Sequence, residues 1–272
     1  MPRSPSRTQD CLAVLRAGAP AEKCAAARRA ADGAGPWRAA GDPTPTTPAR
    51  PARPLLERPG RMPRRRLSSA AGRVALLHAV AHIEFNAIDL AFDMAARFAP
   101  AIDAADLDAD RFVADWIGVG ADEARHFDLV CDRLKALGAA YGDLPAHGGL
   151  WEAADATADD ALARLAVAPM VLEARGLDVT PDMIAKLKAV GDDESAGVLQ
   201  VIYRDEIGHV ATGRRWFDAL CAARGSDPET TFKRLVRARF RGLLKPPFNT
   251  EARAAAGLPE RYYAPLAGDA GA

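Results

Sequence analysis

The sequence predicts an all-α protein built around a four-helix bundle. From Ser69 onward, apolar residues recur every three or four positions over several long stretches, which is typical of amphipathic helices. No stretch shows the strict alternation of apolar and polar residues that indicates a strand. Glycine and proline residues divide the periodic region into four long segments, and each segment can cross a domain core.

The four segments have predicted limits at recognisable helix stop signals. The first should end before Pro100, because proline lacks an amide proton and crowds the preceding turn. The second should stop at Gly138, and a short helix after Thr180-Pro181 should join the third to the fourth. The predicted bundle helices cover residues 69–98, 108–137, 157–175 and 194–223.

The connection between the second and third helices is long enough to change the topology. Residues 138–156 could extend over up to ~60 Å, whereas a helix of about 28 residues is only ~42 Å long. This connection can therefore cross the whole bundle and join two antiparallel helix pairs, which is the ferritin-like topology. We place the bundle at residues 69–245 and a C-terminal extension at residues 246–272.

Residues 1–68 form a basic, proline-rich arm. The arm holds 14 Lys/Arg against 5 Asp/Glu, although the whole chain has no net charge. Such a composition predicts partial disorder, with one or two short helices in residues 8–32 and an extended course from Pro43 to Pro63. A basic arm could bind nucleic acid or an acidic membrane face. We favour a tail wrapped on the acidic bundle, because no aromatic residues alternate with the arginines.

The chain has no uninterrupted run of 18 apolar residues and no signal-peptide core, so we expect a soluble, cytoplasmic protein. Its four cysteines occur singly, without C-x-x-C spacing. This spacing predicts free thiols rather than a disulfide framework or a zinc site.

A repeated motif carries the chemistry. Residues 122–126 read Asp-Glu-Ala-Arg-His, and residues 205–209 read Asp-Glu-Ile-Gly-His. Glu and His at positions i and i+3 project from one face of a helix and can bind the same metal ion. The first and third helices each place one glutamate, Glu84 or Glu173, on an apolar face. The predicted ligands of a dinuclear metal site are Glu84, Glu123, His126, Glu173, Glu206 and His209.

Charge supports this prediction. Four glutamates that face one core would repel one another and lose their hydration, whereas two divalent ions would cancel their charge. Carboxylate and imidazole ligands, at three protein residues per ion, leave coordination positions open and suit iron better than a closed zinc site. Two iron ions are the first choice, and manganese or a mixed iron–manganese pair is the alternative.

Three neighbours of the ligands are predicted to support them. Metal-bound histidines commonly donate their second ring N–H to a carboxylate. Asp122 would then bond His209, and Asp205 would bond His126; the alternative is a pair of exposed aspartates. Tyr203 lies one turn before Glu206, so its phenol could bond a ligand, although a structural role in the core is favoured.

Other polar residues have less specific interpretations. A second polar stripe on the first helix, at His78, His82, Asn86, Asp89 and Asp93, should face solvent or the arm. His147 in the crossover is interpreted as a surface residue, with lining of an entrance as the alternative. Pro169, four residues before Glu173, predicts a break in the third helix. Gly120 and Gly213 predict either space beside the metals or close helix contact.

The sequence resembles an uncharacterised bacterial ferritin-like family, domain of unknown function 455, from about Pro63 to Ala256. The resemblance rests on residues 82–90 (HIEFNAIDL), 141–147 (YGDLPAH), 172–181 (LEARGLDVTP) and 205–211 (DEIGHVA). It implies a ferritin-like bundle with all six ligand positions filled. The wider superfamily includes ferroxidases, rubrerythrins, ribonucleotide reductase small subunits and di-iron hydroxylases, one of which acts on tRNA. No reaction is assigned to the family itself.

The preferred functional hypothesis is an oxidoreductase in which a di-iron centre uses dioxygen or peroxide to oxidise a small-molecule substrate, with an electron donor as a further partner. The alternatives are a ferroxidase or iron-binding protein without an organic substrate, and an RNA-directed di-iron hydroxylase. An apolar pocket that reaches the metals would favour the first hypothesis, and a polar channel would favour a ferroxidase. Nucleic acid is a disfavoured partner, a membrane is not expected, and a homodimer is left open.

Overall fold

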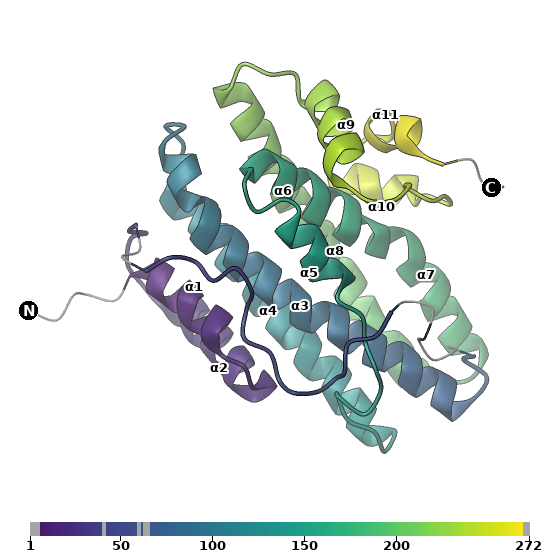
Figure 1. The fold of residues 1–272 in the computed structure, drawn as a ribbon. Coiled ribbons are helices and arrows are strands. Elements are labelled where there is room, and N and C mark those ends of the chain that lie inside the picture. The colour runs from purple at the N-terminus through teal and green to yellow at the C-terminus, as the bar shows by residue number, and fades with distance from the viewer. Residues whose placement is uncertain (1–5, 40–41, 59–60, 62–65, 269–272) are drawn as a thin grey trace, which may run out of the picture.

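The computed structural model describes residues 6–39, 42–58, 61 and 66–268. Within these ranges the chain is helical and forms no β-strand (Figure 1). Its extended segments pair only in two isolated bridges, between Leu56 and Ala146 and between Leu244 and Ala267. The predicted all-α fold class is therefore confirmed.

Two long helices, α3 (Ala70–Asp103) and α4 (Ala109–Ala136), lie side by side. Ser69 and Asp108 cap their first turns by accepting hydrogen bonds from backbone amides. The prediction that the first helix ends before Pro100 was wrong, because α3 continues through this proline to Asp103. Phe98, Ala99 and Ile102 are buried in the core, and their packing offsets the hydrogen bond that Pro100 cannot make.

The second helix pair is less regular. After the crossover and the short helix α5 (Gly149–Asp155), the chain forms α6 (Ala161–Val167), the π-helical segment η2 (Ala168–Glu173) and α7 (Ala174–Ala189). The fourth long helix, α8 (Asp193–Ala223), packs along α7. The expected short helix after Pro181 is wrong, because α7 runs through this proline without interruption. Packing of Leu177 and Ile184 in the core holds the turn in place.

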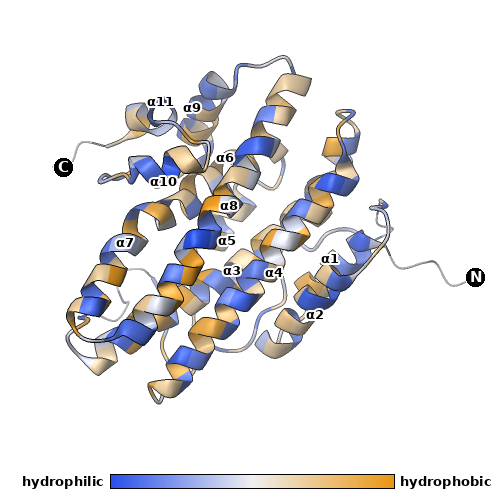
Figure 2. Ribbon diagram, turned by 180° about the vertical axis from the view of Figure 1, so that it is seen from behind, coloured by the Kyte–Doolittle hydropathy of each residue, from blue (hydrophilic) through white to orange (hydrophobic). Residues whose placement is uncertain are grey.

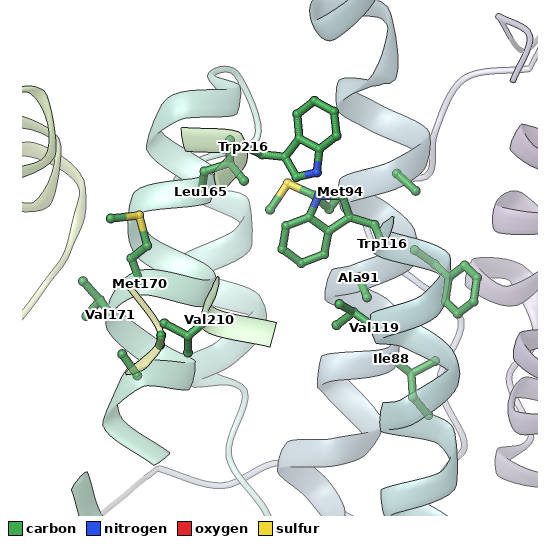
Figure 3. Packing of buried hydrophobic residues seen from close by; sticks show 14 of the residues in the cluster. Ile88, Ala91, Met94, Trp116, Val119, Leu165, Met170, Val171, Val210 and Trp216 are labelled. Carbon is green, nitrogen blue, oxygen red and sulfur yellow. The ribbon is translucent and has the colours of Figure 1, made fainter. Parts of the chain in front are cut away.

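The core lies between these helices. In Figure 3, Ile88, Ala91 and Met94 of α3 face the same apolar layer as residues of α4, α6, η2 and α8. The ring of Trp216 on α8 meets Phe112 of α4 edge-on at 5.1 Å between ring centroids. The hydropathy colouring in Figure 2 shows polar residues along the outer faces of the same helices.

The N-terminal segment adds a further layer rather than a loose tail. Helices α1 (Arg7–Arg16) and α2 (Pro20–Asp32) pack against α3 and α4, as Figure 1 shows. Their side chains Cys11, Leu12 and Cys24 are fully buried. Residues 42–58 hold no helix, while Pro59 and Pro63 lie outside the described residues.

Short helices complete the C-terminal part of the chain: α9 (Pro228–Arg239), α10 (Thr250–Ala255), α11 (Glu260–Tyr263) and the 3-10 turn η3 (Ala264–Leu266). The buried side chain of Arg253 donates to both carboxylate oxygens of Asp178, at 2.8 and 2.7 Å, and so ties α10 to α7.

By length and composition, α3 could cross a membrane. However, 83% of its most apolar 18-residue window is buried inside the protein. This burial is what the core helix of a soluble protein shows. The four cysteines are free, in agreement with the sequence analysis.

Candidate metal centre

Four helical segments bring the six predicted ligands into the interior of the molecule. Glu84 comes from α3, Glu173 is the last residue of η2, and the two Glu-x-x-His pairs come from α4 and α8. Glu84, Glu123, His126 and His209 are buried. Glu173 and Glu206 are slightly more exposed, and both line a cavity, as Glu84 does.

Glu123 occupies the middle of the cluster. Its Oε2 lies 3.3 Å from Nδ1 of His126, and its Oε1 lies 3.0 Å from Nδ1 of His209. On the outer sides, Glu84 Oε2 is 3.4 Å from Nδ1 of His126, and Glu206 Oε2 is 3.8 Å from Nδ1 of His209. One potential ligand atom from each of Glu84, Glu123, His126 and Glu206 lies within 4.8 Å of the other three. These four residues could therefore hold a metal ion.

Several inward-facing atoms of the cluster lack hydrogen-bond partners. Glu173 Oε2 and Glu206 Oε2 have no hydrogen-bond partner, and the contacts of Glu84 Oε2 with His126 and of Glu123 Oε1 with His209 lack hydrogen-bond geometry. Buried polar atoms are normally paired, and leaving a charged one unpaired is costly. A cation held by Glu84, Glu123, His126 and Glu206 would satisfy the carboxylate oxygens of that group, whereas Glu173 and His209 lie outside it. The donor set fits a carboxylate- and imidazole-bound metal.

The crowded carboxylates and imidazoles shift one another's pKa values. Burial and the charge of Glu123 raise the pKa of Glu84 to about 8 and that of Glu173 to about 7, and they raise the pKa of Glu206 well above its ordinary value. Burial alone would raise the pKa of Glu123, but the two facing imidazoles outweigh it and hold this pKa well below its usual range. Burial alone would lower the pKa of His126, but its contacts with Glu123 and Glu84 raise it to about 11.

An outer layer of charges contacts the far side of both imidazoles. Asp205 Oδ2 lies 3.1 Å from Nε2 of His126, and Asp122 Oδ2 lies 3.4 Å from Nε2 of His209. Each aspartate thus contacts the histidine of the opposite motif. Sequence reasoning missed Arg125, whose Nη2 donates to Asp205 at 2.6 Å and to Asp122 at 3.2 Å. The only signal for it was the three-residue spacing between Asp122 and Arg125.

Tyr203 has a different partner from the one expected at a metal. Its hydroxyl accepts a hydrogen bond from Nδ2 of Asn249 at 2.9 Å. The phenol therefore holds the C-terminal segment against α8, which agrees with the structural alternative.

The polar stripe on α3, which was expected to face solvent or the arm, does not face solvent; the arm alternative holds for Asp89, which pairs with Lys23 of α2. All five of its side chains are buried. His82 Nδ1 lies 2.9 Å from the hydroxyl of Tyr141, its Nε2 lies 3.2 Å from the carbonyl oxygen of His147, and His78 Nε2 accepts from the Gly142 amide at 2.9 Å. Distant segments supply the partners of this stripe, and residues 141–147 of the crossover are held on α3 by it.

The predicted break near Pro169 takes the form of the π-helical segment η2. Short π segments inside helices are frequent at functional sites, and this one ends at Glu173. Gly213 makes room for the segment, since a Cβ there would lie 2.3 Å from Cγ of Pro169. A Cβ at Gly120 would lie 2.5 Å from Cε2 of Phe92. Both glycines therefore permit close contact rather than leave space at the metal site.

A cavity of about 440 Å³ lies beside the cluster, between α3, α7, α8 and the crossover. Glu84, Glu173 and Glu206 form part of its wall, and most other lining residues are apolar. His147 also lines it, so the alternative interpretation of this residue is the one that the structure supports.

The fold and this cluster define the class of protein: an all-helical protein with a buried carboxylate–histidine group that could hold a metal ion. The chain belongs to the family described as "Protein of unknown function (DUF455)", whose model matches residues 16–264. It is 45% identical over 208 residues to an "Uncharacterized protein" of Haemophilus influenzae, covering 76% of this chain and 72% of the relative. No solved structure gives a significant match.

Proposed function

We propose that the protein is a ferritin-like four-helix-bundle oxidoreductase that holds two iron ions and uses dioxygen or peroxide to oxidise a small organic substrate. One observation carries this proposal: Glu84 and Glu206 belong to a carboxylate–histidine group that could hold a metal ion, and both also line a mostly apolar cavity. A site that only bound iron would need no such cavity, whereas an organic substrate requires one.

The ligand roles follow from the positions of the side chains. Glu84, Glu123, His126 and Glu206 would hold one ion. Glu173 and His209 would complete a neighbouring site, with Glu123 between the two imidazoles. Four carboxylates balance the charge of two divalent ions. Manganese, alone or paired with iron, is the alternative to iron for the same donors.

When bound, the ions would supply the redox chemistry. Dioxygen takes up four electrons on reduction to water, two from the substrate and two from a donor, whereas peroxide takes up two and needs no donor. The protein's own contribution is positional. Asp205 and Asp122 orient the imidazoles, and the apolar cavity wall keeps water away from the substrate.

The test is to reconstitute the protein with Fe(II) without oxygen and then to admit air. We expect about two ions per chain and an absorption change upon oxidation. Glu206→Ala should lower the iron content and abolish the change, because Glu206 belongs to the cluster. Glu194→Ala on the same helix is the control, since its side chain is 79% exposed. Fewer than one tightly bound ion per chain, with no effect of Glu206→Ala, would overturn the proposal.

A further inference from the structure

We propose that the 440 Å³ cavity is the substrate site and that it selects an uncharged, predominantly apolar organic molecule, which it presents to Glu84, Glu173 and Glu206. This inference rests on the proposed function and adds the class of substrate. The volume lies within the range of ~300–1,000 Å³ that is usual for small-molecule sites.

The wall offers mainly apolar contact. Apolar side chains from four helical elements form it, and these include Val80 and Leu90 of α3, Leu172 of η2, Met183 of α7, and Leu199 and Ile202 of α8. An apolar molecule gains free energy by moving from water to such a wall, while a polar molecule would lose hydrogen bonds there.

The polar side chains of the wall, other than the glutamates, are mostly engaged within the protein. Both ring nitrogens of His82 face protein partners, and Nε2 of His78 accepts the backbone amide of Gly142. Nη1 of Arg175 donates to the carbonyl oxygen of Lys245 at 2.6 Å. A charged or strongly polar substrate would have to compete with these bonds, so the wall discriminates against it.

Exposed apolar side chains lie at this cavity and at a pocket next to it. Ile83 lines the cavity and is nevertheless 47% exposed. Leu55 and Leu56, which line a second pocket that shares His82 with this cavity, are 60% and 52% exposed. Exposed large apolar side chains beside a cavity suit the entry of an apolar molecule.

The cavity approaches the cluster from one side. Its lining includes three of the glutamates but neither His126 nor His209. The histidines are instead backed by Asp205, Asp122 and Arg125. The reacting part of a bound substrate should therefore lie against the glutamates.

Gly176 offers a way to fill the cavity without disturbing the cluster. It lines the cavity within α7, and a Cβ built on it meets no other atom within 4 Å. Gly176→Leu should therefore fold, because leucine is also a better helix former than glycine. Gly197→Leu is the matched control, since Gly197 is an exposed glycine of α8 with equally free space around its Cβ.

The experiment measures binding of naphthalene, 1-octanol and glucose to the full-length, iron-loaded protein by titration calorimetry, with the iron content determined for every sample. We expect the wild type and Gly197→Leu to bind at least one apolar probe and not glucose. Gly176→Leu should bind that probe at least tenfold more weakly with unchanged iron content. If Gly176→Leu does not fold, Ala87→Phe on the opposite wall is the replacement and should show the same loss.

Each remaining result has a defined meaning. Iron-loaded wild type that binds neither apolar probe, or binds glucose more tightly, would overturn the apolar substrate class and leave the proposed function intact. Equal probe binding by Gly176→Leu and the wild type would show that the probe lies elsewhere, which also overturns the inference. Probe binding to a protein that retains no iron would instead overturn the proposed function.

Discussion

At the scale of single residues, Arg125 connects the two halves of the candidate metal centre. Its Nη2 donates to Asp205 and Asp122, and these aspartates contact His126 and His209. One guanidinium, on a side chain that is 46% exposed, therefore bonds both carboxylates that contact the imidazoles. Mutation of residues that hydrogen-bond the ligands of a metal often weakens metal binding, although these residues do not contact the metal.

We predict that Arg125→Ala weakens metal binding about tenfold, because both aspartates lose their shared donor. Arg125→Lys should fall between the wild type and alanine, since an ammonium group cannot reproduce the planar guanidinium. Competition between the protein and a chelator for Mn(II) measures the affinity. Arg111→Ala is the control on the same helix, with a side chain that is 67% exposed and paired with Asp115. An affinity of Arg125→Ala within twofold of the wild type would contradict the prediction.

At the scale of helices, Asp192 joins three of the long ones. It caps α8 by accepting a hydrogen bond from the backbone amide of Ser195 at 3.1 Å. Its carboxylate also forms ion pairs with Arg73 of α3 at 3.1 Å and with Arg133 of α4 at 2.9 Å. Burial alone would raise the pKa of Asp192, but the bonds from Ser195 and Arg133 outweigh it and lower this pKa. A carboxyl group whose pKa is lowered by folding stabilises the folded state at pH values above its unfolded pKa, which is 3.8 here. That stability is lost as the pH falls through the lower pKa of the folded state.

We predict that Asp192→Asn lowers the free energy of unfolding by about 1–3 kcal/mol at pH 7. Asparagine retains the helix cap, so the loss reports on the charge. The difference from the wild type should stay constant from pH 7 down to the unfolded pKa of 3.8 and narrow below it, where the carboxyl group takes up a proton first in the unfolded and then in the folded state. Urea unfolding at several pH values measures it, and the exposed neighbour Asp193→Asn serves as the control. A difference that did not narrow below the unfolded pKa would exclude the charge as its cause.

The sequence was most informative where one helix face follows a simple pattern. The ranges predicted for the first, second and fourth bundle helices agree with α3, α4 and α8 within a few residues, apart from the extension past Pro100. The repeated Asp-Glu-x-x-His pattern singled out Glu123, His126 and Glu206, which lie together with Glu84 in the group that could hold a metal ion. Pseudo-symmetric spacing further predicted that each aspartate would contact the opposite histidine, and the structure places Asp205 beside His126.

The sequence was least informative where polar groups are buried against distant segments. A stripe such as Asp89 and Asp93 resembles a solvent face until its partners are known, and here these are Lys23 of α2 and Arg164 of α6. Proline was also a weak guide to helix ends, because core packing carries α3 and α7 past Pro100 and Pro181. Local composition cannot reveal such tertiary compensation.

At the scale of the whole molecule, the basic N-terminal segment is part of the core. Leu12, Val14 and Leu15 of α1 are buried, as are Cys24 and Ala27 of α2. The ammonium group of Lys23 bonds Asp89 on α3 and the carbonyl oxygen of Val14, and the side chains of both Lys23 and Asp89 are completely buried. A buried ion pair of this kind fixes the position of a segment, because either charge left alone would be strongly destabilising.

We predict that Lys23→Ala lowers the free energy of unfolding by about 3–5 kcal/mol near pH 8, because it leaves the Asp89 carboxylate buried without a partner. Burial raises the pKa of Asp89 to about 7 even though Lys23 opposes this effect. The pKa of Asp89 is thus higher in the folded state than the 3.8 of the unfolded state. The neutral carboxyl group favours the folded state at low pH, and this contribution to stability is lost as the pH rises from 3.8 through about 7. The loss of stability in Lys23→Ala should therefore be smaller at pH 5, where Asp89 can be neutral.

Urea unfolding at both pH values measures this loss. The exposed Lys186→Ala is the control, and the double variant Lys23→Met with Asp89→Leu should regain most of the stability. An equal defect at pH 5 and pH 8, or no recovery in the double variant, would mean that the N-terminal helices are held by apolar packing alone.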